Sequence, residues 1–219
     1  MNLKGYEDAR WRGMDQTIEF RHRAALALIA GGSVLDLGCG DGLLLTLLKD
    51  RIDKSVGLDI SPEAIRKATT RGCDARVHSF DEPLPFEAGA FDTVVLLDVL
   101  EHLYDPMLVL KEAARVARQR IIVGVPNFSS LPARLQMLLG KVPENNRPNK
   151  GHLYWFNHTV LREIAGAAGL ELATLYTNTF RPFSLLGEWP TRLLPNLLAL
   201  SFVAELRAKS GQYPIERLP

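Results

Sequence analysis

The chain has 219 residues, of which 47% are hydrophobic and 23% charged, as is typical of one soluble domain with a full-sized core. A formal net charge of +1 gives no electrostatic footprint for nucleic acid or for an anionic membrane, so neither is expected as a partner. Two cysteines are too few for a disulfide framework, no Cys/His cluster has zinc-ligand spacing, and the first residues lack the apolar core of a signal peptide. We therefore expect a cytoplasmic protein without a bound metal.

Two segments precede the first predicted strand. Residues 1–14 are polar and aromatic, and a frayed terminus is one interpretation of them. Residues 15–30 have apolar side chains near helical spacing and are followed by two glycines, which predicts an amphipathic helix packed on a sheet.

The stretch 34–42 predicts a buried strand that ends in a turn with three glycines, followed at once by a helix over about 43–51. Glycines allow positive φ and let a ligand approach bare backbone, so we interpret the turn as a binding loop. A dinucleotide fingerprint would have a third glycine where Leu43 stands, and Asp36 and Asp41 would repel a pyrophosphate. We expect an acidic rim around the turn, which suits a ligand with an ammonium group and hydroxyls.

A second strand and helix follow directly. The strand over 55–59 ends in Asp59, a helix begins at Pro62 and runs to about 71, and a third strand covers 75–78. Taken alone, Asp59 is as consistent with a helix cap as with a ligand contact. Its position 21 residues after Gly38 fits one strand-turn-helix-strand unit and favours a ligand contact at the same sheet edge.

The run 91–97 is almost entirely apolar, as a central parallel strand should be, and it leads into a tip at 98–103. Ligands bind beyond the carboxyl ends of parallel strands, so this tip faces the same site. His102 is the candidate catalytic residue, because an ordinary histidine pKa suits a general base. A packing or capping role for His102 is equally consistent with the sequence.

The second half of the chain continues the alternation of helices and strands and then departs from it. We predict a helix from Pro106, a strand over 120–125, a capped helix after Asn157, and closing strands at 171–177 and 198–206. The irregular segments 129–151 and 180–196 are candidate walls of a substrate site. His152 and Tyr154 are candidates to reach the site.

The stretch 34–42 resembles motif I of class I S-adenosylmethionine-dependent methyltransferases. The resemblance covers about residues 33–207 and implies a three-layer α/β sandwich, with a Rossmann-like, seven-stranded, mostly parallel sheet whose last strand is antiparallel. It also implies S-adenosylmethionine as cofactor, with Asp59 on the ribose and either Ser79 or Asp81 on the adenine amino group. In related enzymes a leading segment folds over the cofactor, which makes residues 1–32 a lid and helix. We expect a polar tail at 208–219.

The resemblance implies a set of cofactor-binding residues at the ends of the first four strands: Asp36, Gly38, Cys39, Gly40, Asp59, Ile60, Ser79, Phe80, Asp81 and Leu97. His102 lies near the position that borders the reacting methyl group in the family. The tip lacks the Asn/Asp-Pro-Pro-aromatic tetrad of amino-group base methyltransferases, and neither cysteine follows a proline. A small-molecule acceptor is therefore favoured.

Within this superfamily the chain is similar to the MetW-like group, through the stretches 34–44, 126–128 and 195–198 and the Asn-rich stretch before His152. That likeness implies an alternative function, namely a cofactor-binding subunit that modulates a homoserine acyltransferase in methionine biosynthesis. The neighbouring residues Glu101 and His102 look more like ordinary small-molecule methyltransferases and favour catalysis. A nicotinamide-dependent oxidoreductase is a third option, disfavoured by Leu43 and the acidic turn.

Overall fold

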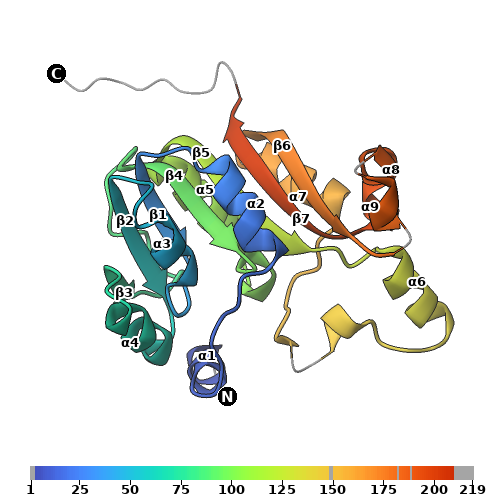
Figure 1. Cartoon of the computed structure of the whole chain (residues 1–219), viewed down its shortest axis with the longest axis horizontal. Helices are drawn as coiled ribbons and strands as arrows, with labels where there is room; N and C mark the ends of the chain where they lie inside the picture. Colours follow the sequence, from blue (N-terminus) through green and yellow to red (C-terminus); the bar gives the residue numbers. More distant parts are fainter. Residues whose placement is uncertain (1–2, 148–149, 182, 188, 210–219) are drawn as a thin grey trace.

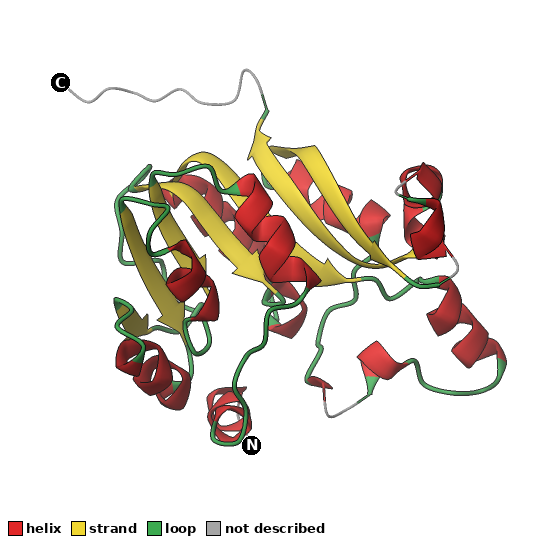
Figure 2. Ribbon diagram, in the orientation of Figure 1, coloured by secondary structure: helices red, strands yellow, loops and turns green. Residues whose placement is uncertain are grey.

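The protein folds around a seven-stranded sheet with helices on both faces (Figures 1 and 2). The computed structural model describes residues 3–147, 150–181, 183–187 and 189–209. The strands lie in the order β3-β2-β1-β4-β5-β7-β6, and β7 pairs antiparallel with both β5 and β6 while the remaining pairs are parallel. The predicted fold class is confirmed.

The first half of the chain alternates helices and strands, as predicted. Its elements are α1 (Leu3–Trp11), α2 (Phe20–Leu28), β1 (Ser33–Leu37), α3 (Leu43–Leu48), β2 (Lys54–Asp59), α4 (Pro62–Thr70) and β3 (Ala75–Val77). The start of α4 shows why the sequence folds locally in this way. The side chain of Ser61 accepts a hydrogen bond from the backbone N–H of Ala64, and Pro62 occupies the first helical position, where its missing N–H costs nothing.

The second half supplies the rest of the sheet and the irregular segments. Its elements are β4 (Phe91–Leu97), the 3₁₀-helix η1 (Leu100–His102), α5 (Pro106–Val116), β5 (Ala117–Pro126), α6 (Leu131–Leu138), η2 (Glu144–Asn146), α7 (His158–Ala167), β6 (Leu170–Thr179), η4 (Phe183–Leu186), α8 (Trp189–Leu193), α9 (Pro195–Leu198) and β7 (Ala199–Ala208). The side chains of Asp105 and Asn157 cap α5 and α7 by accepting backbone hydrogen bonds.

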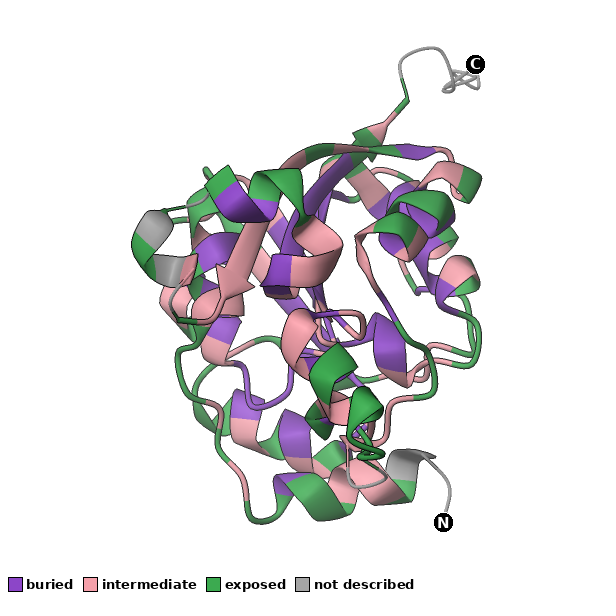
Figure 3. Cartoon of the chain, turned by 90° about the vertical axis from the view of Figure 1, so that its right-hand side faces the viewer, coloured by how far each residue is buried: buried purple, intermediate pink, exposed green. Residues whose placement is uncertain are grey.

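Neighbouring residues of the central strands point to opposite faces of the sheet and are buried on both. Leu35 and Val94 belong to the cluster that α5 and α7 cover, whereas Val34 and Val95 belong to the cluster that α2 and α3 cover. Figure 3 shows the same pattern, with buried residues concentrated on the strands and exposed ones on the outer turns of the helices. Burial on both faces explains why these strands have continuous apolar sequences.

The N-terminal region differs most from the prediction. The expected helix over 15–30 is shorter, because a capping box between Glu19 and His22 starts α2 at Phe20 and leaves the preceding residues outside a helix. Residues 3–11 form α1 rather than a frayed terminus. Of the expected tail, residues 210–219 lie outside the described part of the chain. Among the described residues, none of the helices combines the length and the apolar character that a membrane crossing requires.

Candidate active site

A cavity of about 800 Å³ opens at the carboxyl ends of the parallel strands. Eight of the eleven predicted site residues line it: Gly38, Asp59, Ile60, Ser79, Phe80, Asp81, Leu97 and His102. These residues come from the ends of β1, β2 and β4, from the loop after β3, and from η1. The strand ends therefore converge on one site, as parallel strand order requires.

Three predicted residues, Asp36, Cys39 and Gly40, do not line the cavity. Asp36 and Cys39 are buried behind it, and burial raises the pKa of the Cys39 thiol. Gly40 is covered from outside, because a Cβ atom there would collide with the ring of Trp11. The glycines of the turn thus make room for protein side chains: a Cβ atom at Gly38 would collide with the side chain of Val99, and one at Gly42 would lie 2.9 Å from the sulfur of Cys73.

The prediction of an acidic rim around the turn is wrong for Asp36 and Asp41, the two residues on which it was based. Burial, and to a smaller extent the charge of Asp59, raises the pKa of Asp36 to about 8, so this carboxyl is mostly neutral at neutral pH. Asp41 is fully buried and pairs with Arg71 at 2.7 Å, and the same oxygen accepts a hydrogen bond from the backbone N–H of Gln16 at 2.9 Å. Among these carboxylates, Asp59 is the one that reaches the cavity.

Asp59 is held rigidly at the end of β2. Its Oδ2 accepts the backbone N–H of Gly40 and its Oδ1 that of Ser61, each at 2.9 Å. Burial raises the pKa of the carboxyl, whereas these two hydrogen bonds lower it. A carboxylate oxygen accepts more than one hydrogen bond, so both oxygens retain capacity for a ligand in the cavity.

The loop after β3 brings the two alternatives for the adenine contact together. Ser79 Oγ donates to Asp81 Oδ2 at 3.2 Å, and the backbone N–H of Asp81 donates back to Ser79 Oγ at 3.4 Å. Both side chains line the cavity, and Phe80 between them contributes an apolar surface. The geometry leaves both residues available to one ligand group.

The tip of β4 is strained and charged. Asp98 has a φ of 55°, a left-handed conformation that is uncommon for any residue other than glycine. Its carboxylate pairs with Arg21 at 2.7 Å, and Arg21 also pairs with Glu19 at 2.6 Å. This chain of ion pairs connects the end of β4 with the start of α2 in the wall of the cavity.

Behind Asp98, η1 places Glu101 and His102 in the cavity wall beside His152. Burial lowers the pKa of His102 to about 4, and the charge of His152 contributes in the same direction. Glu101 is completely buried, and burial together with the charge of Asp98 raises its pKa. At neutral pH His102 is therefore a neutral imidazole of low basicity, which weakens the prediction that it acts as a general base.

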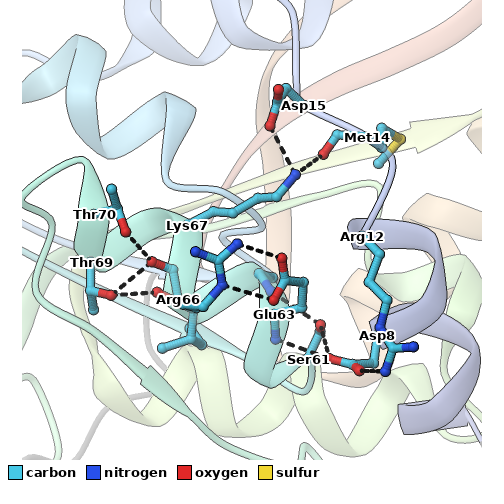
Figure 4. A network of polar contacts seen from close by, with 12 residues as sticks. Asp8, Arg12, Met14, Asp15, Ser61, Glu63, Arg66, Lys67, Thr69 and Thr70 are labelled. Carbon is cyan, nitrogen blue, oxygen red and sulfur yellow. Dashed lines mark hydrogen bonds and ion pairs between the residues drawn. The ribbon is translucent and has the colours of Figure 1, made fainter.

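Three residues of α1 line the cavity although no site role was predicted for them from the sequence: Glu7, Arg10 and Trp11. α1 lies beside α4 (Figure 1) and is anchored to it by polar contacts (Figure 4). Asp8 Oδ1 accepts hydrogen bonds from Ser61 Oγ at 3.1 Å and from the backbone N–H of Glu63 at 3.0 Å. The polar and aromatic composition of residues 1–14 was the only signal for this contact.

The remaining walls agree in part with the prediction. His152 lines the cavity, as do Asn145 and Lys150 from the segment at 129–151, whereas Tyr154 does not. None of the described residues between 180 and 196 lines the cavity, so that candidate wall is wrong. Its place is taken by strand residues on either side of the segment: Asn178, Leu200, Ser201 and Phe202.

Comparison with known proteins places this site in a family context. Residues 20–173 match the sequence profile of the family described as methionine biosynthesis protein MetW. A ubiquinone biosynthesis O-methyltransferase from Xanthomonas euvesicatoria pv. vesicatoria is 31% identical over 181 residues, which cover 78% of this chain and 76% of that protein. The match to the enzyme of the same name from Xanthomonas oryzae pv. oryzae is 32% identical over 96 residues and spans about 40% of the length of that protein.

A further relative and two solved structures complete the comparison. A bifunctional methionine biosynthesis protein MetXA/MetW from Rhodopirellula baltica is 33% identical over 126 residues, which cover 52% of this chain and 20% of that protein. The magnesium protoporphyrin IX methyltransferase of Synechocystis, with bound SAH, superposes with a TM-score of 0.65 at 19% identity, covering 95% of this chain and 96% of that one. A SAM-dependent methyltransferase from Archaeoglobus fulgidus gives 0.65 at 18% identity, covering 95% and 100%. These structures share the fold.

Proposed function

This chain belongs to the MetW family, and we propose that it is an S-adenosylmethionine-dependent methyltransferase that acts on a small-molecule acceptor. The observation that carries the proposal is the position of Asp59, a buried carboxylate 6% exposed, which points into the cavity from the end of β2 beside the glycine turn. The Xanthomonas relative, an O-methyltransferase by name, supports an oxygen acceptor.

The cavity residues suit the parts of the cofactor in turn. Asp59 accepts hydrogen bonds from the ribose hydroxyls, and the backbone at Gly38 lies along the amino-acid end. Asp81 or Ser79 accepts from the adenine amino group. The guanidinium of Arg10, which is 3.5 Å from Glu7, is a cation in the cavity wall that fits the cofactor carboxylate.

The reaction we propose is an in-line displacement in which the acceptor atom attacks the methyl carbon and the sulfonium leaves as a thioether. Catalysis then comes mainly from holding acceptor, methyl and sulfur in line. His102 borders this region as the predicted catalytic residue, although its low pKa makes it a poor base at neutral pH. The free thiols of Cys39 and Cys73 fit a cytoplasmic location, and the near-zero net charge fits an acceptor other than nucleic acid.

Two measurements test the proposal. Isothermal titration with S-adenosylhomocysteine and, in parallel, with NAD should give a saturable signal for the first ligand alone. Transfer of labelled methyl groups to a panel of hydroxylated small molecules should then identify the acceptor class. Binding of NAD in preference to S-adenosylhomocysteine, or binding of neither ligand at millimolar concentration, would contradict the proposal.

A second candidate function is a cofactor-binding subunit that modulates a homoserine acyltransferase. The relative from Rhodopirellula baltica favours it, because that protein is named a bifunctional methionine biosynthesis protein MetXA/MetW, which joins MetW to a second methionine biosynthesis protein in one chain. The end of α6 offers an apolar surface for a partner, since Leu138 is 82% and Leu139 72% exposed. Co-purification with the acyltransferase, abolished by Leu138→Glu and unaffected by Asp53→Asn, would support this function; methyl transfer by the isolated chain would favour the first one.

A further inference from the structure

One wall of the cavity contains three neighbouring side chains, each with an oxygen or nitrogen atom that can donate an electron pair to a metal ion. Glu101, His102 and His152 each offer one ligand atom, and these atoms lie within 4.8 Å of one another. The rings of His102 and His152 meet edge to face, with centroids 4.9 Å apart. All three side chains line the cavity, so the cluster is open to a ligand on one side.

Glu101 is the least expected member of this cluster. Its side chain is 0% exposed, and neither Oε1 nor Oε2 has a hydrogen-bond partner among the described residues. Burying a carboxyl group without hydrogen bonds is costly, and native proteins leave few such groups without a compensating water or ion. Glu101 lines the cavity, so a ligand bound there is in a position to supply the partner that its carboxyl group lacks.

Backbone contacts fix the geometry of the two histidines. The Nδ1 atom of His102 lies 3.1 Å from the carbonyl oxygen of Gly151, and because a carbonyl only accepts, Nδ1 carries the proton and Nε2 keeps its lone pair. The backbone oxygen of Glu101 accepts hydrogen bonds from the N–H groups of Leu153 at 2.7 Å and Tyr154 at 3.0 Å. These bonds hold the segment that carries His152 against η1, as outer contacts hold metal ligands in place.

We propose that Glu101, His102 and His152 bind a divalent transition-metal ion. A carboxylate oxygen with two imidazole nitrogens is a ligand set for Mn²⁺, Fe²⁺, Co²⁺ or Zn²⁺ rather than for Ca²⁺ or Mg²⁺, which prefer oxygen ligands throughout. Three protein ligands leave positions open on the cavity side. Asp98 adds a second negative charge nearby, while Arg10 and Arg21 limit the total charge of the wall. This proposal differs from the expectation, drawn from the sequence, that the chain has no bound metal.

The binding of the ion is independent of the proposed function, but its role rests on that function. An ion with open positions takes the hydroxyl oxygen of the acceptor as a ligand and lowers its pKa, so that the hydroxyl releases its proton to solvent water. The oxygen–carbon bond then forms as the carbon–sulfur bond of the cofactor breaks, and the electron pair of the broken bond neutralises the sulfonium. His102 serves as a ligand in this arrangement, not as a base.

The test is a titration of the chelator-treated full chain with MnCl₂, with free Mn²⁺ followed by electron paramagnetic resonance. We expect about one ion per chain, and at least about tenfold weaker binding for Glu101→Gln and for His152→Gln. His158→Gln, which removes a histidine outside the cluster, should bind as the wild type does. Pulsed measurements should detect two imidazole nitrogens on Mn²⁺ in the wild type and one in His152→Gln.

Thermal unfolding followed by circular dichroism, measured for each variant, separates loss of the ion from loss of the fold. A wild-type chain that binds neither Mn²⁺ nor Co²⁺ stoichiometrically at millimolar concentration would overturn the inference, as would wild-type affinity in both cluster variants. S-adenosylhomocysteine binding is measured on the same samples. Cofactor binding without ion binding overturns the ion site alone, whereas ion binding without cofactor binding overturns the proposed function alone.

Discussion

At the scale of single residues, Asp59 serves the fold and the site with the same two oxygens. Each oxygen accepts one backbone hydrogen bond, from Gly40 on one side and Ser61 on the other, so the carboxylate holds the glycine turn and the start of α4 together. The position of this residue at a strand end was predictable from the sequence. The anchoring of the turn was not, because it depends on contacts between separate elements.

Asp59→Asn is expected to weaken S-adenosylhomocysteine binding by roughly 10- to 100-fold. The substitution replaces one acceptor oxygen of Asp59 by an NH₂ group, which cannot accept hydrogen bonds from backbone N–H groups or from the ribose hydroxyls. A hydrogen bond to a charged group contributes about 1.5–3 kcal/mol, which corresponds to this loss of affinity. Isothermal titration measures the affinity, and Asp53→Asn, an exposed aspartate outside the site, is the matched control. A variant that loses unfolding free energy but keeps wild-type affinity would show that Asp59 has a structural role only.

The burial of His22 predicts that the free energy of unfolding depends on pH. Burial lowers its pKa to about 4, whereas an unfolded chain has the ordinary value of about 6.5. As the pH falls, His22 is protonated in the unfolded state before it is protonated in the folded state. The contribution of neutral His22 to the free energy of unfolding is therefore complete above pH 6.5 and is lost as the pH falls towards 4.

The matched variant for this test is His22→Gln. Glutamine preserves an acceptor for the Glu19 N–H, which Nδ1 of His22 accepts at 3.1 Å, but does not titrate. Between about pH 7 and about pH 5, the free energy of unfolding should fall by about 2 kcal/mol more in the wild type than in the variant. Urea unfolding at each pH measures the difference, and parallel pH profiles would refute the assignment.

At the scale of elements, the placement of α1 in the cavity wall is the main feature of the site that the sequence did not specify. Lys67 of α4 donates to the backbone oxygen of Met14 at 2.7 Å and to Asp15 at 2.9 Å, which extends the anchoring of α1 along the next residues (Figure 4). Trp11 closes over Gly40 at the end of this segment. The composition of residues 1–14 allowed a lid or a loose end, and only the spatial position of α4 distinguishes the two.

Asp8→Ala should speed the release of S-adenosylhomocysteine several-fold and move the midpoint of global unfolding little. The substitution removes the acceptor for Ser61 and Glu63 at the start of α4, so α1 opens more often while the sheet stays intact. Stopped-flow measurement of tryptophan fluorescence would follow the release, since Trp11 lies in the cavity wall.

Arg12→Ala is the control for this prediction. The Arg12 side chain is 73% exposed, and its removal breaks the ion pair with Asp8 but keeps the hydrogen bonds between Asp8 and the start of α4. Equal release rates in the wild type, Asp8→Ala and Arg12→Ala would mean that α1 does not limit exchange.

At the scale of the whole molecule, the central strands and the core followed from the sequence, and the seven-stranded mixed sheet followed from the family resemblance, while long-range polar pairing followed from neither. The apolar runs predicted the central strands, and burial on both faces bears this out. The ion pair of Asp41 with Arg71, and the placement of Glu101 near two histidines, depend on distances set by the finished sheet. The two short stretches 126–128 and 195–198 prove to be one feature, because the Asn127 amide donates to the carbonyl oxygens of Asn196 at 3.1 Å and Ala199 at 2.7 Å.

Asn127→Ala should lower the free energy of unfolding by about 2–3 kcal/mol. Asn127 is completely buried, and its removal takes away the donor to the carbonyl of Ala199 and the acceptor for the N–H of Ser129. These bonds join the end of β5 to the start of β7, so the antiparallel edge of the sheet should unfold more easily. Gln119→Ala, at an exposed amide on β5, should stay within about 0.5 kcal/mol of the wild type in chemical denaturation. Equal losses in the two variants would contradict this role.

The position of α1 also bears on how specificity is inferred across relatives. The profile match begins at residue 20, so Glu7, Arg10 and Trp11 belong to the cavity but not to the matched region. Two proteins that match that profile equally well can therefore differ in the N-terminal residues that cover the same cavity. Ligand preferences transferred by alignment should be checked first against whatever each chain places before its matched segment.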